Sequence, residues 1–356
     1  MGLDDNQLRK LEHLEIVLNE SVEGPNTTFF EYVFIPHQAY SDLTFDDIDL
    51  RVRVFGKDLQ APIFISGMTG GAPGTEKINE KLAEVAEKYG LGLGVGSQRA
   101  AIENPSLQYT FKVVRKHARS IPVLANIGAH EFVKYDMRKI LDIINMIEAD
   151  ALAIHLNIAQ EMIQLEGTPT FKNLLIKVGE VLKEISIPIV IKEVGNGLSY
   201  EVVKAFHEVG VNHFDVQGAG GTNWVLVEKY RALRKGNTLK GFVADNIADV
   251  GIPTAASIVE ARNAAPNAFI IGSGGIRKAS DVIKALRLGA DAVGLASPIL
   301  KAYFNGVLEE YLHALLHGVK ACFILSGSRN VSELRTKPVI ITSLLKEWIT
   351  ARGIRV

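Results

Sequence analysis

Short apolar runs recur along the chain, separated by amphipathic stretches. The runs are mostly continuous rather than alternating, which is typical of parallel strands covered on both faces. They predict eight strands, at residues 62–66, 91–95, 122–127, 151–156, 188–194, 213–217, 269–273 and 292–296. Apolar residues at helical spacing predict intervening helices, among them 75–90, 199–210 and 278–290, and Gly90 stands where a C-cap would end the first of these.

This alternation predicts an α/β fold, a TIM (β/α)8 barrel, because eight βα units fit within 356 residues. The alternative is an open doubly wound sheet, which usually has fewer strands. Such a sheet also carries a G-x-G-x-x-G fingerprint after its first strand. Residues 67–71, GMTGG, follow the first predicted strand and lack that spacing. The pattern therefore favours the closed barrel.

Two segments interrupt the rhythm. Residues 1–60 precede the first strand and predict an N-terminal extension of a barrel domain that spans 61–356. Within the extension, 31–40 and 50–55 are expected to cover the floor or side of the barrel. Residues 218–251 form an over-long connection after the sixth strand, which predicts a long loop. Loops of this length are usually lids, binding loops or disordered segments.

Composition narrows the function classes. The formal net charge of −1 gives no basic field, so nucleic acid is not an expected partner. Cys322 is the single cysteine, which excludes an intramolecular disulfide and an all-cysteine metal site. We find neither a signal-peptide pattern at the N-terminus nor an apolar run of about 18 residues, so we expect a soluble cytoplasmic protein with no membrane span.

Polar residues or glycines follow nearly every predicted strand. In a TIM barrel the active site lies at the carboxyl ends of the strands. One polar residue at a strand end is usually an ordinary surface residue, but a ring of them predicts a catalytic rim. The ring consists of Met68, Thr69, Ser97, Gln98, Arg99, Asn126, His155, Asn157, Gln160, Glu161, Lys192, Glu193, Gln217, Gly274, Gly275, Ile276, Arg277, Ala296 and Ser297.

Two stretches in this ring point to anions. Adjacent Gly274 and Gly275, with the helix start near Lys278, predict a phosphate site formed by backbone N–H groups. A glycine-rich turn without a ligand is the alternative. Lys192 lies in the apolar run PIVIKEV, where an ammonium group is costly unless paired. It either pairs with a carboxylate such as Glu193 or faces an anionic cofactor ring, and the nearby phosphate site favours the ring.

The chain resembles the type 2 isopentenyl-diphosphate isomerases, FMN-dependent TIM-barrel enzymes, over almost its whole length. SQR, HLN-x-x-QE and GAGGT in this order are specific to that family, whereas the glycine-rich phosphate motif is shared by many FMN barrels. The matching stretches are RKLEH (9–13), SGMTGG (66–71), GVGSQRA (94–100), ANIG (125–128), HLNIAQE (155–161), IKEVGNG (191–197), GAGGTNW (218–224), GIPTAAS (251–257) and IGSGGIR (271–277).

The resemblance implies that isopentenyl and dimethylallyl diphosphate are interconverted by a 1,3-proton shift, for isoprenoid precursor synthesis. It implies FMN, reduced by NADPH, as the acid and base, with Mg²⁺ on the substrate diphosphate. It also implies a homotetramer or homooctamer.

The same resemblance assigns roles to individual residues. Glu161 would bind the metal, and Gln160, His155 and Lys192 are the candidate catalytic residues. FMN binding falls to Gly67, Met68, Thr69, Ser97, Asn126, Lys192, Gln217, Thr222, Gly274, Gly275, Ile276, Arg277, Ala296 and Ser297. Substrate binding falls to Arg9, Lys10, Ser97, Gln98, Arg99, Asn157 and Gln160.

Several of these roles have alternatives. Lys192 would stabilise negative charge on the reduced flavin, and Gln160 would position the diphosphate or relay a proton. His155 would orient this cluster or is a core histidine. The sequence departs from the family pattern at Gln217, where a small residue is usual, and at Leu165 and Val250. The first departure puts one FMN contact in doubt.

Other activities remain as alternatives. A flavin oxidase of 2-hydroxy acids needs a histidine base and an arginine pair near the loop after strand six, but residues 217–224, QGAGGTNW, contain neither. A nucleotide dehydrogenase needs a mid-chain cysteine, whereas Cys322 lies in the apolar stretch KACFIL. A flavin-binding protein without catalysis would bind FMN with no spectral response to diphosphate.

Overall fold

Eight parallel strands form a closed barrel in the computed structural model, which describes residues 5–356. The barrel closes where Val293 on the last strand pairs with Ile63 on the first. All eight predicted strands are therefore confirmed, and so is the TIM-barrel fold. The strands are β4 (Ile63–Ile65), β5 (Gly92–Gly94), β6 (Val123–Gly128), β7 (Ala151–His155), β8 (Ile189–Lys192), β9 (His213–Asp215), β10 (Phe269–Ser273) and β11 (Ala292–Leu295).

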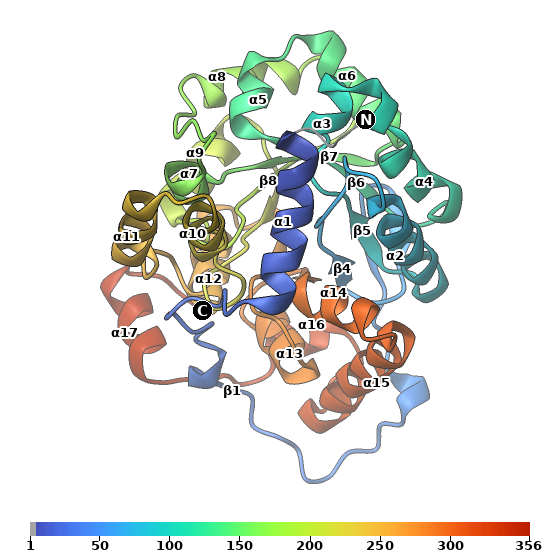
Figure 1. The fold of residues 1–356 in the computed structure, drawn as a ribbon. Coiled ribbons are helices and arrows are strands. Elements are labelled where there is room, and N and C mark those ends of the chain that lie inside the picture. The colour runs from blue at the N-terminus through green and yellow to red at the C-terminus, as the bar shows by residue number, and fades with distance from the viewer. Residues whose placement is uncertain (1–4) are drawn as a thin grey trace.

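Helices surround the barrel (Figure 1). The predicted first helix is confirmed: α2 buries apolar residues including Ile78 and Leu82 and ends at Gly90, whose φ of +64° suits glycine. The other helices of the outer layer are α4 (Tyr109–His117), α6 (Met137–Met146), α8 (Leu174–Val181), α9 (Tyr200–Glu208), α12 (Thr254–Ala264), α13 (Ala279–Arg287) and α15 (Leu308–Ser326), beside α2 (Thr75–Tyr89). Additional helices are α3 (Arg99–Glu103), α5 (Ala129–Lys134), α7 (Ile158–Ile163), α14 (Ser297–Phe304), α16 (Val331–Thr336), α17 (Ser343–Ala351), and the 3-10 turns η1 (Phe30–Tyr32), η2 (Phe45–Asp47) and η3 (Pro105–Leu107).

The barrel interior is apolar toward the amino ends of the strands, which form the floor, and polar toward their carboxyl ends, which form the mouth. Phe64, Leu124 and Val190 belong to a cluster that fills the lower interior. At the carboxyl ends, the register places His155 beside Lys192, and Lys192 beside Asp215. Since neighbours in register point the same way, polar side chains gather on one layer at this end of the barrel.

The N-terminal extension serves both ends of the barrel. Helix α1 (Asp5–Asn19) runs across the mouth (Figure 1), where Arg9 and Lys10 meet residues from the strand ends in one cavity. The hairpin of β2 (Val52–Val54) and β3 (Lys57–Leu59) packs into the lower cluster, which confirms the expectation that residues 50–55 cover the floor. Strand β1 (Val33–Phe34) pairs with β12 (Ile340–Ile341), and the neighbouring turn η1 contacts α13 and α17, so this segment packs beside helices outside the barrel.

Residues 218–251 form the long connection after the sixth strand that the sequence predicted, but they fold largely into helices rather than an irregular loop. They contain α10 (Trp224–Arg234) and α11 (Thr238–Ile247), which pack against each other and against α7. Asn223 starts α10, since its side chain accepts the N–H groups of Val225 and Leu226. The helical signal is weak in the sequence because the buried face of α10 carries charged residues, Glu228 and Arg231, among its apolar ones.

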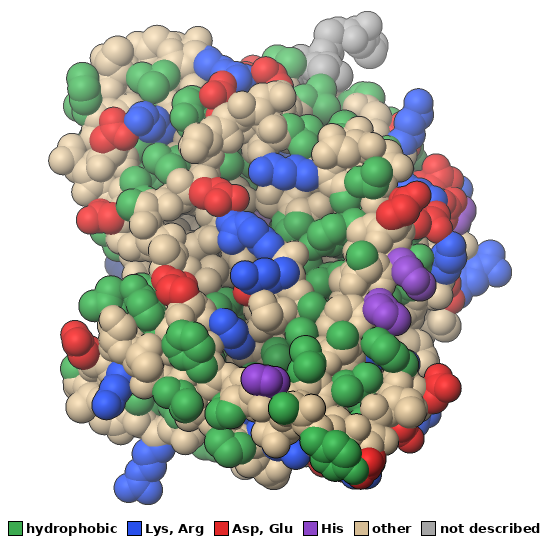
Figure 2. Space-filling view, turned by 90° about the horizontal axis from the view of Figure 1, so that it is seen from below, with side chains coloured by type: hydrophobic (Ala, Val, Ile, Leu, Met, Phe, Trp, Pro, Cys, Tyr) green, Lys and Arg blue, Asp and Glu red, His purple; other side chains and the backbone are tan. Residues whose placement is uncertain are grey.

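The surface mixes charge types. Figure 2 shows Lys, Arg, Asp and Glu side chains scattered among hydrophobic ones over one face, without a continuous field of one sign. Among residues 5–356, we find no helix whose length and apolar content would suit it to cross a bilayer.

Candidate active site

A cavity of about 200 Å³ opens at the mouth of the barrel between α1 and the loops that follow the strands. It collects nearly every residue that the sequence predicted for the site, from segments far apart in the chain. These are Arg9, Lys10, Gly67, Met68, Ser97, Arg99, Asn126, His155, Asn157, Gln160, Glu161, Lys192, Gln217, Thr222, Gly274, Gly275, Ile276, Arg277, Ala296 and Ser297.

Gln98 and Thr69 are not among the residues that line this cavity. Gln98 is fully buried: its Nε2 donates to the carbonyl of Ile143 (2.9 Å), and its Oε1 accepts the N–H of Asn126 (3.0 Å). Its side chain therefore ties the end of β6 to α6. Thr69 is 1% exposed, and its hydroxyl is buried without a hydrogen-bond partner in the described chain. For both, the sequence indicated the right loop but not the direction of the side chain.

Three cations converge at one part of the cavity. Burial, followed by the charges of Arg9 and Arg99, lowers the pKa of Lys10 to about 7. Burial and Arg99 also lower the pKa of Arg9, whose Nε is buried without a hydrogen-bond partner in the described chain. Such a cluster favours an anion with several charges, because phosphate oxygens would satisfy these donors.

The first residues of α7 present a carboxylate to the cavity. Asn157 donates from Nδ2 to Oε1 of Glu161 (2.9 Å), and the N–H of Thr168 donates to Oε2 (2.8 Å). These bonds fix the Glu161 carboxylate but leave lone pairs on both oxygens. Mg²⁺ takes oxygen ligands and needs few protein carboxylates when phosphate oxygens and water complete its shell. Glu161 fits that requirement.

His155 is a neutral imidazole in this site. Asn126 donates from Nδ2 to the carbonyl of Val95 (2.9 Å), so its Oδ1 is the atom that lies 2.9 Å from Nδ1 of His155. Nδ1 therefore carries the proton, and Nε2 is left as an acceptor. Burial, followed by the charge of Lys192, lowers the pKa of His155 to about 3. His155 belongs to the cavity wall, which counts against the core-histidine alternative.

Lys192 lies in the cavity wall with its ammonium nearly enclosed. Its Nζ donates to the backbone carbonyl of Glu193 (3.2 Å), while the Glu193 carboxylate accepts the N–H groups of residues 194–196. Burial lowers the pKa of Lys192, and the carboxylates of Asp215 and Glu193 oppose this effect. The alternative of an ion pair with the Glu193 side chain is thus replaced by a backbone contact, which leaves the cation available to the cavity.

Glycines bring the loop after β4 into backbone contact with the loop after β5, and the loop after β10 into contact with the loop after β9. A Cβ on Gly67 would lie 2.1 Å from the carbonyl of Val95, and one on Gly274 would lie 2.1 Å from that of Gly218. Gly274 has a φ of +103°, which further favours glycine. The result is a wall without side chains, which suits a phosphate and a flat ring.

Two predicted FMN residues have contacts within the chain. Arg277 donates to the carbonyl of Gly220 (3.2 Å) and pairs with Glu23 (2.8 Å). Gln217 adopts a φ of +42° and donates from Nε2 to Oδ2 of Asp215 (3.0 Å). The larger side chain at position 217 is therefore accommodated by a polar contact inside the barrel.

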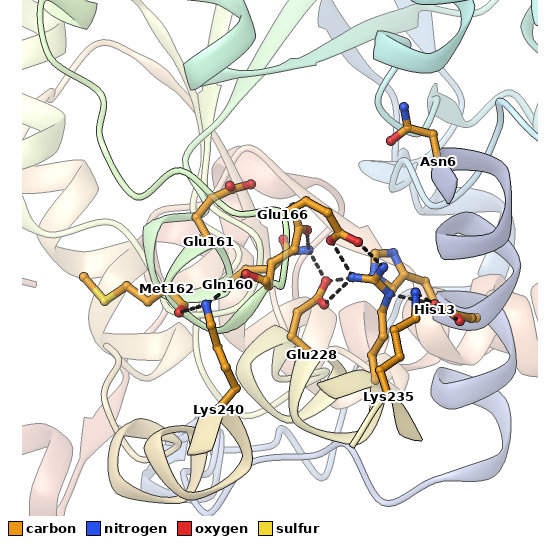
Figure 3. A network of polar contacts seen from close by, with 12 residues as sticks. Asn6, His13, Gln160, Glu161, Met162, Glu166, Glu228, Lys235 and Lys240 are labelled. Atoms are coloured by element: carbon orange, nitrogen blue, oxygen red, sulfur yellow. Dashed lines mark hydrogen bonds and ion pairs between the residues drawn. The ribbon is translucent and has the colours of Figure 1, made fainter. Parts of the chain in front are cut away.

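A buried polar network that the sequence did not indicate lies beside Gln160 (Figure 3). His13 and Gln160 point toward Glu228, with Nε2 of each close to its Oε1, at 2.8 Å and 3.1 Å. Burial acts to raise the pKa of Glu228, but His13 and Arg231 outweigh it and the pKa is lowered. Arg231 also pairs with Glu12 (2.7 Å) and so holds α1 against α10.

This network was missed because Glu228 falls in the segment that was predicted to be a loop. The only signal available was the helical spacing that places His13 on one face with Arg9. Trp224 adds to the same wall, since its ring lies edge-on to His13 at a centroid distance of 5.1 Å.

Known proteins resemble this chain in sequence and in fold. A family model described as FMN-dependent dehydrogenase matches residues 159–341. The isopentenyl-diphosphate delta-isomerase of Ignicoccus hospitalis is 47% identical over 349 residues, covering 97% of this chain and 96% of the relative. The enzyme of that name from Sulfurisphaera tokodaii is 47% identical over 350 residues, covering 97% and 94%.

Solved structures with low identity share the fold. A lactate oxidase of Pediococcus acidilactici gives a TM-score of 0.66 at 15% identity, covering 96% of each chain. A mandelate oxidase with benzoyl-formic acid gives 0.62 at 16% identity, covering 94% of this chain and 95% of the other. At such identity these likenesses concern the barrel alone.

The sequence relatives extend over nearly the whole chain, and their identity is far above that of the structural neighbours. The matching family model describes FMN-dependent enzymes. The glycine wall (Gly67, Gly274 and Gly275) and the cation cluster (Arg9, Lys10 and Arg99) line one cavity. The chain therefore belongs to the type 2, FMN-dependent isopentenyl-diphosphate delta-isomerases.

Proposed function

We propose that this protein interconverts isopentenyl and dimethylallyl diphosphate by a 1,3-proton shift, with reduced FMN as acid and base and Mg²⁺ on the diphosphate. The observation that carries the proposal is the pairing of two anion sites in one cavity. Arg9, Lys10 and Arg99 provide one, and the loops around Gly274 and Gly275 provide the other. An enzyme that binds a flavin phosphate beside a substrate diphosphate needs both.

The glycine wall supports FMN binding. Backbone N–H groups of the loop at 274–277 and the side chain of Thr222 would hold the phosphate, and Asn126 and Lys192 would face the ring. When bound, the reduced flavin would supply the proton donation and abstraction that the described side chains are poorly suited to perform. Lys192, cationic and nearly buried, would stabilise negative charge on that ring.

The cation cluster supports diphosphate binding. Arg9 would use its unpaired Nε, and Lys10 would become fully charged beside the phosphates. Leu14, Val17 and Trp224 line the same cavity and offer apolar surface to the hydrocarbon part of the substrate. Together these residues fix one end of the substrate by charge and exclude water from the other.

Glu161, Gln160 and His155 would complete the site. Glu161 would bind Mg²⁺ together with diphosphate oxygens and water. Gln160 is held by its bond to Glu228 and would position the substrate through its amide. Because His155 is neutral with Nε2 free, it would accept a hydrogen bond rather than donate a proton.

NADPH as the reductant, a homotetramer or homooctamer, and a cytoplasmic location complete the proposal. The reductant and the oligomeric state rest on the family resemblance, and the location is the expectation drawn from the sequence. Self-association is further supported by α11, on which Leu239 is 71% exposed and Phe242 is 68% exposed.

The test is turnover of isopentenyl diphosphate by the purified protein. We expect a yellow protein that forms dimethylallyl diphosphate only after reduction and with Mg²⁺ present, and that does not oxidise lactate or mandelate. Activity in an oxidised buffer without flavin would contradict the mechanism. Bound FMN with no turnover and no spectral response to diphosphate would favour a non-catalytic flavoprotein.

A further inference from the structure

Glu131 is a cavity residue with no role in the site described above. It lies on α5, directly after β6, and its Oε1 accepts from Nη1 of Arg99 at 2.6 Å. Its side chain is 15% exposed and that of Arg99 is 22% exposed, so the pair is largely removed from water. An anion-binding arginine is thus already engaged by a carboxylate of the chain itself.

The absence of a side chain at Gly128 makes room for this arrangement. A Cβ there would lie 2.5 Å from Oε2 of Glu131 and 3.2 Å from Nε2 of His155. The second carboxylate oxygen of Glu131 therefore reaches the side of the cavity where His155 lies. Glu131 also acts electrostatically on Lys10, whose pKa it raises against the larger effect of burial.

The other carboxylates near the cation cluster are engaged elsewhere. Glu228 is bonded to His13, Gln160 and Arg231. Glu161 accepts from Asn157 and from the N–H of Thr168. Among the carboxylates that line the cavity within residues 5–356, Glu131 is the one paired directly with a residue of the cluster.

We propose that Glu131 is the resident counter-charge of the diphosphate site, which pairs with Arg99 while the site is empty and thereby lowers the affinity for diphosphate. The inference rests on the proposed function, in which Arg99 binds the diphosphate. A ligand with several negative charges must compete with Glu131 for the guanidinium and is repelled by it at short range. In return, Glu131 reduces the mutual repulsion of Arg9, Lys10 and Arg99 in the empty protein.

The decisive variant is Glu131→Gln, which retains a hydrogen-bond acceptor for Arg99 but removes the charge. The probe is inorganic pyrophosphate, titrated calorimetrically into the FMN-loaded full chain with Mg²⁺. We expect E131Q to bind pyrophosphate at least about tenfold more tightly, the change that corresponds to one unit of pKa. Glu103→Gln is the matched control, because Glu103 lies 3.7 Å from Nε of Arg99 but is 48% exposed, so we expect its affinity to stay within about twofold.

Thermal unfolding provides a second measurement. Without pyrophosphate, E131Q should melt below the wild type, because its cations repel one another more strongly. With saturating pyrophosphate, its melting temperature should rise by more than that of the wild type. Unchanged or weaker pyrophosphate binding by E131Q would overturn the inference and would make Glu131 a residue that only orients Arg99.

Two further variants separate the possible failures. Should E131Q not fold, Glu131→Ala is expected to show the same tighter binding, and weaker binding would count against the inference. If wild-type protein binds pyrophosphate, and Arg99→Ala abolishes that binding, while E131Q has no effect, then only the counter-charge is refuted. If wild-type protein does not bind pyrophosphate at all, the proposed function fails with it.

Discussion

The two ends of the barrel use charged side chains differently. At the floor, Asp150 pairs with Lys57 (2.9 Å) and Arg115 (2.8 Å), and it also accepts the N–H of Val123 (2.8 Å). At the mouth, Arg9 keeps an unpaired donor, and burial among other cations depresses the pKa of Lys10.

This difference in charge pairing indicates that the floor of the barrel serves stability and that the mouth serves function. Charges at the floor satisfy one another, whereas those at the mouth are only partly satisfied within the chain: Arg99 pairs with Glu131, but Arg9 keeps an unpaired Nε. This is the division of labour expected between the two faces of a TIM barrel. Substitutions at the mouth should therefore affect activity and ligand binding, and those at the floor should affect stability.

The largest effect should follow Glu161→Gln. We expect turnover to fall by at least about 100-fold, because a metal contributes several kcal/mol to charge stabilisation. FMN content, read from the flavin absorbance, should stay near that of the wild type, because Glu161 is proposed to serve the metal. Wild-type turnover in this variant would reject that role.

Arg9→Ala should come next. A charge-assisted hydrogen bond contributes about 1.5–3 kcal/mol, so we expect KM for isopentenyl diphosphate to rise about 10- to 100-fold. Arg9→Lys should recover only part of the loss, because it restores the charge without the planar set of donors. A KM that is unchanged in Arg9→Ala would show that Arg9 does not bind the diphosphate.

Lys192→Ala should weaken the retention of FMN, or the reactivity of the reduced flavin, by about tenfold. A tenfold change corresponds to a loss of about 1.4 kcal/mol of electrostatic stabilisation. Flavin content after dialysis and single-turnover rates measure the two quantities. Lys57→Ala removes a lysine from the floor and serves as the control, with both quantities near wild type. If both stay unchanged in Lys192→Ala as well, the ring contact is refuted.

The pH dependence of pyrophosphate binding should be smaller. The lowered pKa of Lys10, about 7, leaves this group partly neutral in the empty site, and a bound anion would favour its protonated form. Affinity should therefore fall severalfold as pH rises from about 7 to 8. Lys10→Met removes this contribution and leaves only the titration of the ligand, so identical slopes in the two proteins would contradict the prediction.

Asp150→Asn should have the smallest effect on turnover and a clear effect on stability. Breaking a largely buried pair costs about 2–3 kcal/mol, which denaturant unfolding would measure. Turnover below the unfolding transition should remain at the wild-type level. A large loss of turnover at unchanged stability would break the contrast between the two ends.

The barrel could be predicted from the sequence because parallel strands that are buried on both faces consist of continuous apolar runs. The site loops could be located for the same reason, since they begin where such runs end. Helix α10 could not, because Glu228 and Arg231 lie on its buried face and interrupt the apolar stripe.

The orientation of individual side chains was also beyond the sequence. Gln98 stands between Ser97 and Arg99, which both line the cavity, yet its own amide turns back to Ile143. Which face a residue presents depends on contacts with segments distant along the chain. Glu131 carried no motif signal and became visible only through its distance to Arg99.

Helix α1 has a practical consequence for anyone who purifies this protein. Arg9 and Lys10 lie in the first two turns of this helix and line the cavity. An affinity tag fused ahead of the helix would therefore lie only a few residues from the active site. An acidic peptide at that position would compete with the substrate for Arg9 and Lys10. A polyhistidine peptide there would compete for the divalent metal. Kinetic work should therefore use a cleavable handle, or one attached after Val356.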